Sequence, residues 1–334
     1  MGRDAALSKK EYPMKKYNIL VTAVGAIIGY GIVRSLRKCR YHVNIIGMDI
    51  FDDAVGKKWC DSFVKSMPAL EPLFPDFLAE VISTYDIDLV FFGIEPEIDR
   101  IVSGKNLFKG DFSRLVLNKP ELIAFARDKW FLHEMLCSHN FQAIPTLIDG
   151  EYADVIRELG SPCLLKPRRS SASKGICEIH TSKDYYYWKD KLGSNFMVQQ
   201  IIGDNDHEYT VGVFGLGDGS FSQSISFVRK LSRDGSTVKA KTVIIPALDH
   251  EVASLCRLFK PVGPTNFQFR LHDGVFFLLE INPRISSSSS LRTAFGFNEA
   301  EMCISFFCEN KTPKVSILSQ GEATRYIEDI VRYL

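Results

Sequence analysis

No two cysteines in this sequence have the C-x-x-C spacing of a zinc or redox motif, and the eight that occur are scattered. This pattern excludes a disulfide framework and predicts reduced thiols in a cytoplasmic protein. Neither sign of charge dominates, because 41 basic residues stand against 40 acidic ones. The sequence therefore lacks the bulk field that would favour nucleic acid or an anionic membrane surface.

Long apolar runs are also missing. The longest, such as residues 275–279, have the length of a strand and fall far short of the roughly 20 residues that span a bilayer. The N-terminus has no apolar signal-peptide core, and Ala6 stands where myristoylation requires serine or threonine. We expect no membrane partner and a loose leader over residues 1–16.

The sequence has 334 residues, of which 46% are hydrophobic, and this length and apolar content suffice for two domains. A short apolar run at 18–24 precedes Gly25, Gly29 and Gly31, a helical pattern follows, and a second strand ends in Asp49. This order predicts a Rossmann-like α/β unit. Its glycines leave two interpretations open: a dinucleotide site, as in an NAD-dependent enzyme, or tight packing that only glycine permits.

Acidic residues follow the next predicted strand, residues 89–93, as a loop that contains Glu95 and Glu97. Ligands of open α/β sheets bind at this carboxyl edge, so both are candidates for substrate binding. Pro120 then opens a long helical stretch over 120–140, which places a domain boundary near residue 118.

The second half of the chain reads as α+β with mostly antiparallel sheets. We predict helices at 151–159, 182–192 and 249–258, and strands at 163–166, 175–180, 197–201, 209–214, 222–228, 242–245, 265–271 and 275–281.

The last of these strands carries Glu280, Asn282 and Arg284 at alternate positions, so all three are expected on one face. Gln268 can join them from the preceding strand. Oxygen ligands of this kind suit Mg²⁺, with Mn²⁺ as an alternative, and an arginine can hold a phosphoryl oxygen. A solvated edge strand is the competing interpretation.

A second polar segment links the strands that end at Lys166 and begin at Gly175. Its Ser170, Ser171 and Ser173 can donate to phosphate oxygens, but the loop is not a Walker A motif because a strand follows it. A solvated basic hairpin is the alternative. Further on, Glu208 suits ribose hydroxyls; the nearby acidic stretch lacks the ligand spacing of an EF-hand.

Together these segments resemble ATP-grasp enzymes, and most closely the carbamoyl-phosphate-synthase large-subunit type. The resemblance covers residue 17 to beyond 300 and rests on Lys129, Ile144-Pro145-Thr146, Lys166-Pro167, the Gln199–Ile202 hinge, Glu208, Gln268 and the Glu280-Ile-Asn282-Pro-Arg284 motif. It implies a Rossmann-like pre-ATP-grasp domain over 17–118 and a two-lobed α+β ATP-grasp domain over 119–334, with a small lobe near 156–202 and a large lobe near 203–334.

The resemblance also implies a role for each matching residue. ATP would be bound by Lys129, Lys166, Ser170, Ser171, Ser173, Gly175, Gln199, Gln200, Ile201, Ile202 and Glu208, and the metal by Gln268, Glu280 and Asn282. The catalytic candidates are Arg284, Lys241 and Arg229, and the candidates for substrate binding are Glu95, Glu97, Ser287 and Arg292. A solvated surface remains the alternative for Lys241, Arg229 and Arg292.

Members of this family activate a carboxylate as an acyl phosphate and then form an amide, releasing ADP and phosphate. Two departures are visible: serines replace loop glycines, and Gln199 replaces a hinge acid. With one ATP-grasp unit and no glutaminase, the chain is predicted to be an ATP-dependent carboxylate-amine ligase with small-molecule carboxylate and amine substrates, and a homodimer is compatible with the sequence. A nucleotide-binding regulatory protein with degenerate catalysis, or the NAD-dependent enzyme, are the alternatives.

Overall fold

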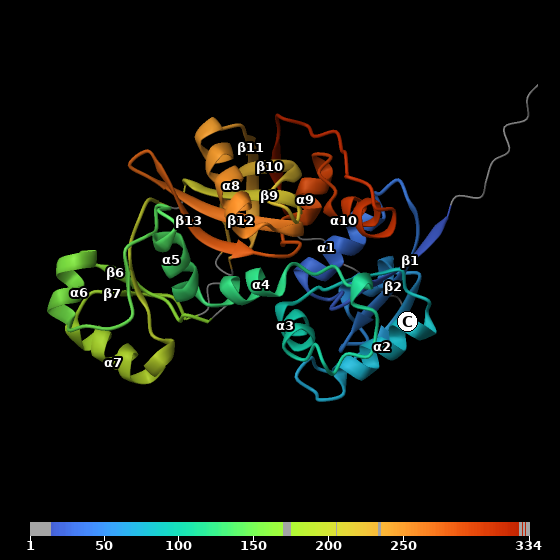
Figure 1. Cartoon of the computed structure of the whole chain (residues 1–334), viewed down its shortest axis with the longest axis horizontal. Coiled ribbons are helices and arrows are strands. Elements are labelled where there is room, and N and C mark those ends of the chain that lie inside the picture. Colours follow the sequence, from blue (N-terminus) through green and yellow to red (C-terminus); the bar gives the residue numbers. More distant parts are fainter. Residues whose placement is uncertain are drawn as a thin grey trace, which may run out of the picture.

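The computed structural model describes residues 15–169, 175–204, 206–232, 235–326, 329 and 331. These residues form three sheets that follow one another along the chain. Figure 1 shows the N-terminal sheet and its helices on one side, the sheet of β6 and β7 on the other, and the C-terminal sheet with α8 above and between them. The predicted class, an α/β domain followed by a two-lobed α+β fold, is confirmed.

The N-terminal sheet is parallel, in the order β3-β2-β1-β4. Its elements are β1 (Lys16–Val21), α1 (Ile27–Leu36), β2 (His42–Asp49), η1 (Val55–Trp59), β3 (Ser62–Lys65), α2 (Phe74–Thr84), β4 (Leu89–Phe91), α3 (Glu95–Ser103) and η2 (Phe112–Arg114). Fully buried Ile19, Ile45 and Leu89 come from three adjacent strands, as expected where helices cover a parallel sheet.

Gly29 of this unit serves packing. Gly29 and Gly31 lie inside α1, not in a turn before it. A Cβ on Gly29 would lie 2.1 Å from the carbonyl oxygen of Ala23, so only glycine fits. The turn amide of Gly25 donates to the carboxylate of Asp49 at 2.7 Å. The acid that a dinucleotide ribose would need is thus hydrogen bonded to the turn itself, which argues against the NAD interpretation.

The stretch after Pro120 contains two helices where one was predicted, α4 (Pro120–Arg127) and α5 (Lys129–Ser138). Asp128 separates them in an extended conformation, and its side chain accepts from the amide of Trp130 at 3.1 Å. Asp128 is therefore the N-cap of α5, and Lys129 begins that helix.

The sheet of the small lobe has the order β5-β8-β6-β7 and is antiparallel. Its elements are β5 (Thr146–Leu147), α6 (Tyr152–Leu159), β6 (Cys163–Leu165), β7 (Cys177–Ile179), α7 (Ser182–Leu192), η3 (Gly193–Asn195) and β8 (Val198–Gln200). Tyr185 of α7 is fully buried against this sheet, and a capping box of Thr181 and Asp184 begins the helix.

The C-terminal sheet has the order β13-β12-β9-β10-β11-β14 and is antiparallel. Its elements are β9 (Glu208–Leu216), β10 (Phe221–Leu231), β11 (Thr237–Val243), α8 (Pro246–Phe259), β12 (Val262–His272), β13 (Val275–Asn282), α9 (Ser289–Ala294), α10 (Glu299–Cys303), the π-helical turn η4 (Ile304–Cys308) and β14 (Glu322–Thr324). The short strands β5 and β14 had no counterpart among the predictions.

The two faces of this sheet differ sharply. One face packs Val211, Phe267 and Phe269 against the apolar side of α8. The other joins the N-terminal body at one end, where Phe214 and Phe227 share a core with Ile32 of α1. The rest of that second face is polar, and it carries the candidate site.

Candidate active site

Polar side chains from four adjacent strands share this face. The register places Glu208 of β9 opposite both Arg229 of β10 and Arg270 of β12, and Gln268 opposite Glu280 of β13. Residues directly opposite in antiparallel strands point to the same side, as do residues two apart on one strand. The sequence prediction that Gln268 and Glu280 meet is thereby consistent with the observed register.

Arginines bind the acid and the amide at the centre of this face. The same Arg229 nitrogen donates to Glu208 at 2.7 Å and to Gln268 at 2.8 Å, and Arg270 donates to the other oxygen of Glu208 at 3.0 Å. Arg229 is only 5% exposed. These charge-assisted hydrogen bonds fix the side chains before any ligand arrives.

Two lysines approach Glu280 from the facing elements, Lys129 at the start of α5 and Lys166 after β6. Burial raises the pKa of Glu280, although the positive charges of Lys129 and Arg284 oppose that rise. Burial likewise lowers the pKa of Lys129, opposed by Glu280. Burial, with Lys129 and Arg270 nearby, lowers the pKa of Lys166 to about 8. The Glu280 carboxylate and the two partly desolvated lysines, Lys129 and Lys166, therefore lie close together.

The Lys166 ammonium donates to Oε1 of Gln199 at 2.8 Å, and Nε2 of Gln199 donates to the hydroxyl of Thr146 at 2.9 Å. Gln200 is tied to Pro145 by a 3.0 Å backbone hydrogen bond, and the Ile202 carbonyl accepts from Arg270 at 3.4 Å. Ile201 lies between them, directly after β8. The predicted hinge is thus joined to both sheets.

Cavity size does not by itself identify this site. The space between Lys129, Lys166 and Gln199 measures only about 20 Å³, enough for a water molecule. A much larger cavity of about 570 Å³ lies elsewhere, beside the linker at Asn118. We place the site by its charges, because a large apolar cavity without convergent polar groups offers nothing to a triphosphate.

The end of β13 connects this face to the N-terminal body. Arg284 lies two residues beyond the strand, in a turn closed by its amide and the Asn282 carbonyl at 2.8 Å. Its guanidinium donates to Oδ1 of Asn282 at 2.9 Å and pairs with Glu95. A predicted substrate residue and a predicted catalytic residue therefore meet. Glu95 and Glu97 occupy the first turn of α3 and not the loop that was expected.

Two predicted site residues lie away from this centre. Lys241 pairs with Glu322 at 3.2 Å and is 63% exposed; the register sets it opposite Val228, on the other face from Arg229. Arg292 is fully buried and pairs with Glu299 at 3.0 Å. A Cβ on Gly212 would lie 2.6 Å from the Arg292 guanidinium carbon, so that glycine makes room for it. Lys241, predicted to be catalytic, is a surface residue. Arg292, predicted to bind substrate, is a core residue.

The remaining substrate candidates are also displaced from the centre. Glu97 is buried and hydrogen bonded to Thr22, and burial, aided by the charge of Asp49, raises its pKa to about 8. Ser287 is half-buried and its carbonyl accepts from Arg325 at 2.7 Å. Gly175 is the first described residue after the predicted phosphate loop, whereas Ser170, Ser171 and Ser173 lie outside the described residues.

Sequence reasoning missed Asp128. This 2%-exposed carboxylate binds Arg168 through two nitrogens, at 2.9 and 3.1 Å, and Arg169 at 3.2 Å. The Lys129 amide also donates to the Arg168 carbonyl at 3.1 Å. Asp128 therefore fixes the start of α5, with Lys129, against the end of the Lys166 strand. Its position directly before a helix was the available signal. Arg270 was missed too, although it lies two residues from Gln268.

The proposed metal ligands fit a magnesium ion by their chemistry. Among the described residues, the half-buried Glu280 carboxylate has no hydrogen-bond or ion-pair partner. The amide oxygens of Gln268 and Asn282 each accept one hydrogen bond from an arginine and keep a second lone pair. One carboxylate with amide oxygens leaves positions for phosphate oxygens and water, as Mg²⁺ prefers. No group of three or more His, Cys, Asp or Glu with metal-binding geometry occurs among the described residues.

Comparison with known proteins identifies the fold that carries these residues. Residues 193–330 match a family model described as "ATP-grasp in the biosynthetic pathway with Ter operon". A search of curated protein sequences found no significant match.

Among solved structures, N5-carboxyaminoimidazole synthetase from Staphylococcus aureus with ADP has a TM-score of 0.70 at 14% identity, covering 93% of this chain and 82% of that one. Biotin carboxylase from Campylobacter jejuni, complexed with β-γ-ATP, has a TM-score of 0.70 at 16% identity, covering 90% and 73%. The biotin carboxylase domain of Hydrogenobacter thermophilus 2-oxoglutarate carboxylase, a dimer with MgADP and bicarbonate, has a TM-score of 0.68 at 13% identity, covering 91% and 73%.

These likenesses establish the fold across nearly the whole chain. No helix in the described residues is long and apolar enough to cross a membrane. The sheets, the hinge between them and the match over residues 193–330 lead to one conclusion: the chain has the ATP-grasp fold, and its C-terminal part is similar to an ATP-grasp family.

Proposed function

We propose that the protein is an ATP-dependent carboxylate-amine ligase that forms a carbon–nitrogen bond. The observation that carries this proposal is the convergence of Lys129 and Lys166 on Glu280, beside the amide oxygens of Gln268 and Asn282. Opposed cationic and anionic groups of this kind suit a triphosphate and its counter-ion, and phosphoryl transfer needs positioning and charge neutralisation more than a protein nucleophile.

The nucleotide lies between the small lobe and the polar face of the C-terminal sheet. Lys129 and Lys166 hold phosphate oxygens, and the backbone of Gln200–Ile202 meets the adenine. Glu208, fixed by two arginines, faces the ribose. Since the space between the lysines now holds only a water-sized volume, ATP entry requires the small lobe to move away from the sheet.

Gln268, Glu280 and Asn282 would hold Mg²⁺, with Mn²⁺ as a substitute. When bound, the ion neutralises charge that develops on the phosphate oxygens. Arg229 keeps Gln268 in place, and Arg284 does the same for Asn282. The two amide side chains therefore present their oxygens in a fixed arrangement.

The reaction proceeds in two displacements. An oxygen of the substrate carboxylate attacks the γ-phosphorus, the bond to the β–γ bridging oxygen breaks, and ADP leaves. The acyl phosphate then reacts with a neutral amine nitrogen, the amide bond forms, phosphate leaves, and the amine loses a proton to solvent. Arg284 is placed to hold the acyl phosphate, because its guanidinium already binds the carboxylate of Glu95.

A screen tests this function directly. Purified protein with Mg-ATP would be incubated with a panel of carboxylates and amines, ADP and phosphate release would be followed, and the product mass would be measured. We expect release that needs both a carboxylate and an amine, and loss of release in Glu280→Gln. ATP turnover that is identical whatever amine is present would contradict a ligase.

A nucleotide-binding regulatory protein is the second candidate, favoured by the arginines that bind the predicted ligands Glu208 and Gln268. It predicts MgADP binding by calorimetry without turnover of any substrate pair. A homodimer is a further proposal, supported by the dimer named for the 2-oxoglutarate carboxylase structure. Light scattering after size exclusion tests it.

A further inference from the structure

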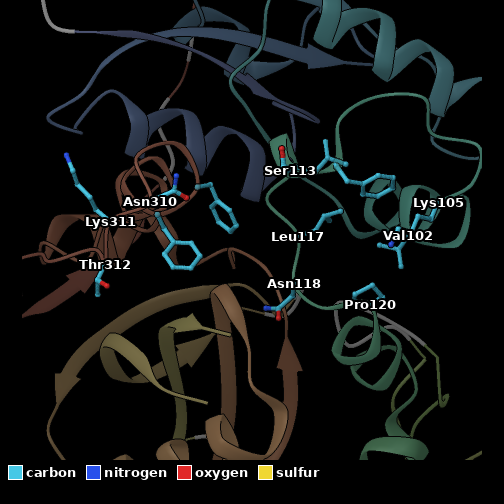
Figure 2. Close-up of a pocket in the computed structure, with 13 residues that line it drawn as sticks. Val102, Lys105, Ser113, Leu117, Asn118, Pro120, Asn310, Lys311 and Thr312 are labelled. Atoms are coloured by element: carbon cyan, nitrogen blue, oxygen red, sulfur yellow. The ribbon is translucent and has the colours of Figure 1, made fainter. Parts of the chain in front are cut away.

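A cavity lies beside Asn118, in the segment between η2 and α4, outside the candidate active site. It measures about 570 Å³, within the size range of small-molecule sites. Figure 2 shows its walls, which come from the end of α3, the segment 112–120 and the C-terminal segment 306–312. None of the residues proposed to bind ATP or metal lines it.

The C-terminal wall is unusual in its backbone. Phe306 and Phe307 belong to the π-helical turn η4, a rare geometry that is frequent at functional sites. Their rings meet edge to face with centroids 5.1 Å apart. Phe307 also lies against Gly263, where a Cβ would come within 3.2 Å of its ring. The turn thus presents two half-buried aromatic side chains to the cavity.

The charge at the cavity has one sign. Its lining includes Lys105 and Lys311 and no acidic residue. The Lys311 ammonium pairs with Glu309 at 3.1 Å, and in Figure 2 its side chain extends outward. The Lys105 ammonium instead lies 5.6 Å from the centroid of the Phe112 ring, which also lines the cavity. Lys105 is therefore the cation available to a ligand.

The inner edge of the cavity is the linker residue Asn118, which is 5% exposed. Its side chain accepts from the Val262 amide at 2.9 Å and donates to Thr265 at 2.8 Å. Both partners lie on β12, the strand that carries Gln268. A ligand packed on Asn118 thus contacts a residue that is hydrogen bonded directly to a strand of the candidate active site.

We propose that this cavity binds a small aromatic or apolar anion, such as an aryl carboxylate, and that this ligand is an effector of the nucleotide site. The aromatic walls take the apolar body, and Lys105 takes the charge at the rim. A free phosphate is disfavoured, because the lining offers one unpaired ammonium and mostly carbon surface. The effector part rests on the proposed nucleotide site; the binding part does not.

Calorimetric titration with 2-naphthoate tests the binding, with neutral 2-naphthamide as the probe that lacks charge. Lys105→Gln should weaken naphthoate about fivefold, the effect of one partly exposed charge pair, and leave the amide unchanged. Lys109→Gln is the matched control, because that lysine pairs with Asp76 and does not line the cavity. We expect a Kd of about 10 μM for naphthoate. Equal weakening in both lysine variants would overturn the proposal. So would the absence of naphthoate binding at about 10 mM, which is about 1000-fold above the expected Kd.

Ser113→Trp tests the location, since Ser113 is exposed at the rim and a larger side chain there obstructs the cavity from outside the core. This variant should abolish binding of both probes while keeping the thermal unfolding temperature of the wild type; unchanged binding refutes the site. Saturating naphthoate should change MgADP affinity about fivefold or more, and MgADP should change naphthoate affinity equally. An unchanged MgADP affinity refutes the effector role, whereas no MgADP binding to the wild type refutes the proposed function alone.

Discussion

Replacing Lys166 with methionine should stabilise the protein while it removes nucleotide binding. The Lys166 ammonium is buried and its pKa is lowered from 10.5 to about 8, so the folded state holds this proton less tightly than the unfolded chain. At pH 7 the difference costs about 3 kcal/mol of folding free energy, from about 1.4 kcal/mol per pKa unit. Loss of the 2.8 Å hydrogen bond to Gln199 offsets about 1 kcal/mol. We expect a net gain of about 2 kcal/mol.

The pH dependence gives the sharper measurement. Because the folded pKa lies below the unfolded one, the unfolded chain binds more protons between about pH 8 and 10.5, and wild-type stability rises with pH there. The cost of the buried charge falls from about 3 kcal/mol at pH 7 to about 2 kcal/mol at pH 9. The advantage of Lys166→Met should therefore shrink by about 1 kcal/mol over this range.

Urea unfolding at pH 7 and pH 9 measures both quantities, and calorimetry with MgADP measures the lost binding. Lys241→Met is the matched control: this lysine is 63% exposed, so its replacement should change stability by less than about 0.5 kcal/mol. A Lys166→Met protein that is less stable than the wild type at pH 7, or whose advantage is the same at pH 9, would refute the reasoning.

Three further substitutions test the neighbours of this lysine. Gln199→Glu places a carboxylate 2.8 Å from the Lys166 ammonium and should raise the pKa of that lysine. MgADP affinity at pH 9, measured by calorimetry, should then exceed that of the wild type. Equal affinities would contradict the contact between residues 166 and 199. Glu280→Gln removes a carboxylate whose pKa is raised by burial, so we expect unchanged or higher thermal stability. ATP turnover should be at least about 100-fold slower. A clear loss of stability would show that Glu280 has a structural role. Asp128→Asn leaves Arg168 with a weaker partner and should lower the free energy of unfolding by about 1–3 kcal/mol, as measured by urea unfolding. It should also raise the KM for ATP in steady-state kinetics. An unchanged KM would mean that Lys129 is positioned without Asp128.

Alternation along strands was readable from the sequence. A side-chain period of two is a local property, so the shared face of Glu280 and Asn282 was readable, whereas the pairing of Gln268 with Glu280 depends on a β-bulge after Gln268 that the sequence did not reveal. The same rule, applied to Arg270, would have added it to the site. The α/β order of the first hundred residues was equally readable, although Gly29 proved to be a packing residue within α1 and not part of a turn.

Residues whose role depends on distant partners were not readable. Lys241 and Arg292 have the same basic character in the sequence, but one lies on an exposed strand and the other is buried against Glu299. Asp128 looked like any polar residue before a helix until the fold brought Arg168 beside it.

The sequence by itself determined the strand order within hairpins, the polar face and the kind of chemistry its oxygens and lysines suit. The tertiary structure alone decided which charges converge: Lys129 and Lys166 on Glu280, Glu95 on Arg284 and two arginines on Glu208. The physical reason is range. Alternation is set by the backbone over two residues, whereas burial and ion pairing depend on groups far apart in the chain that only the packed sheets bring together.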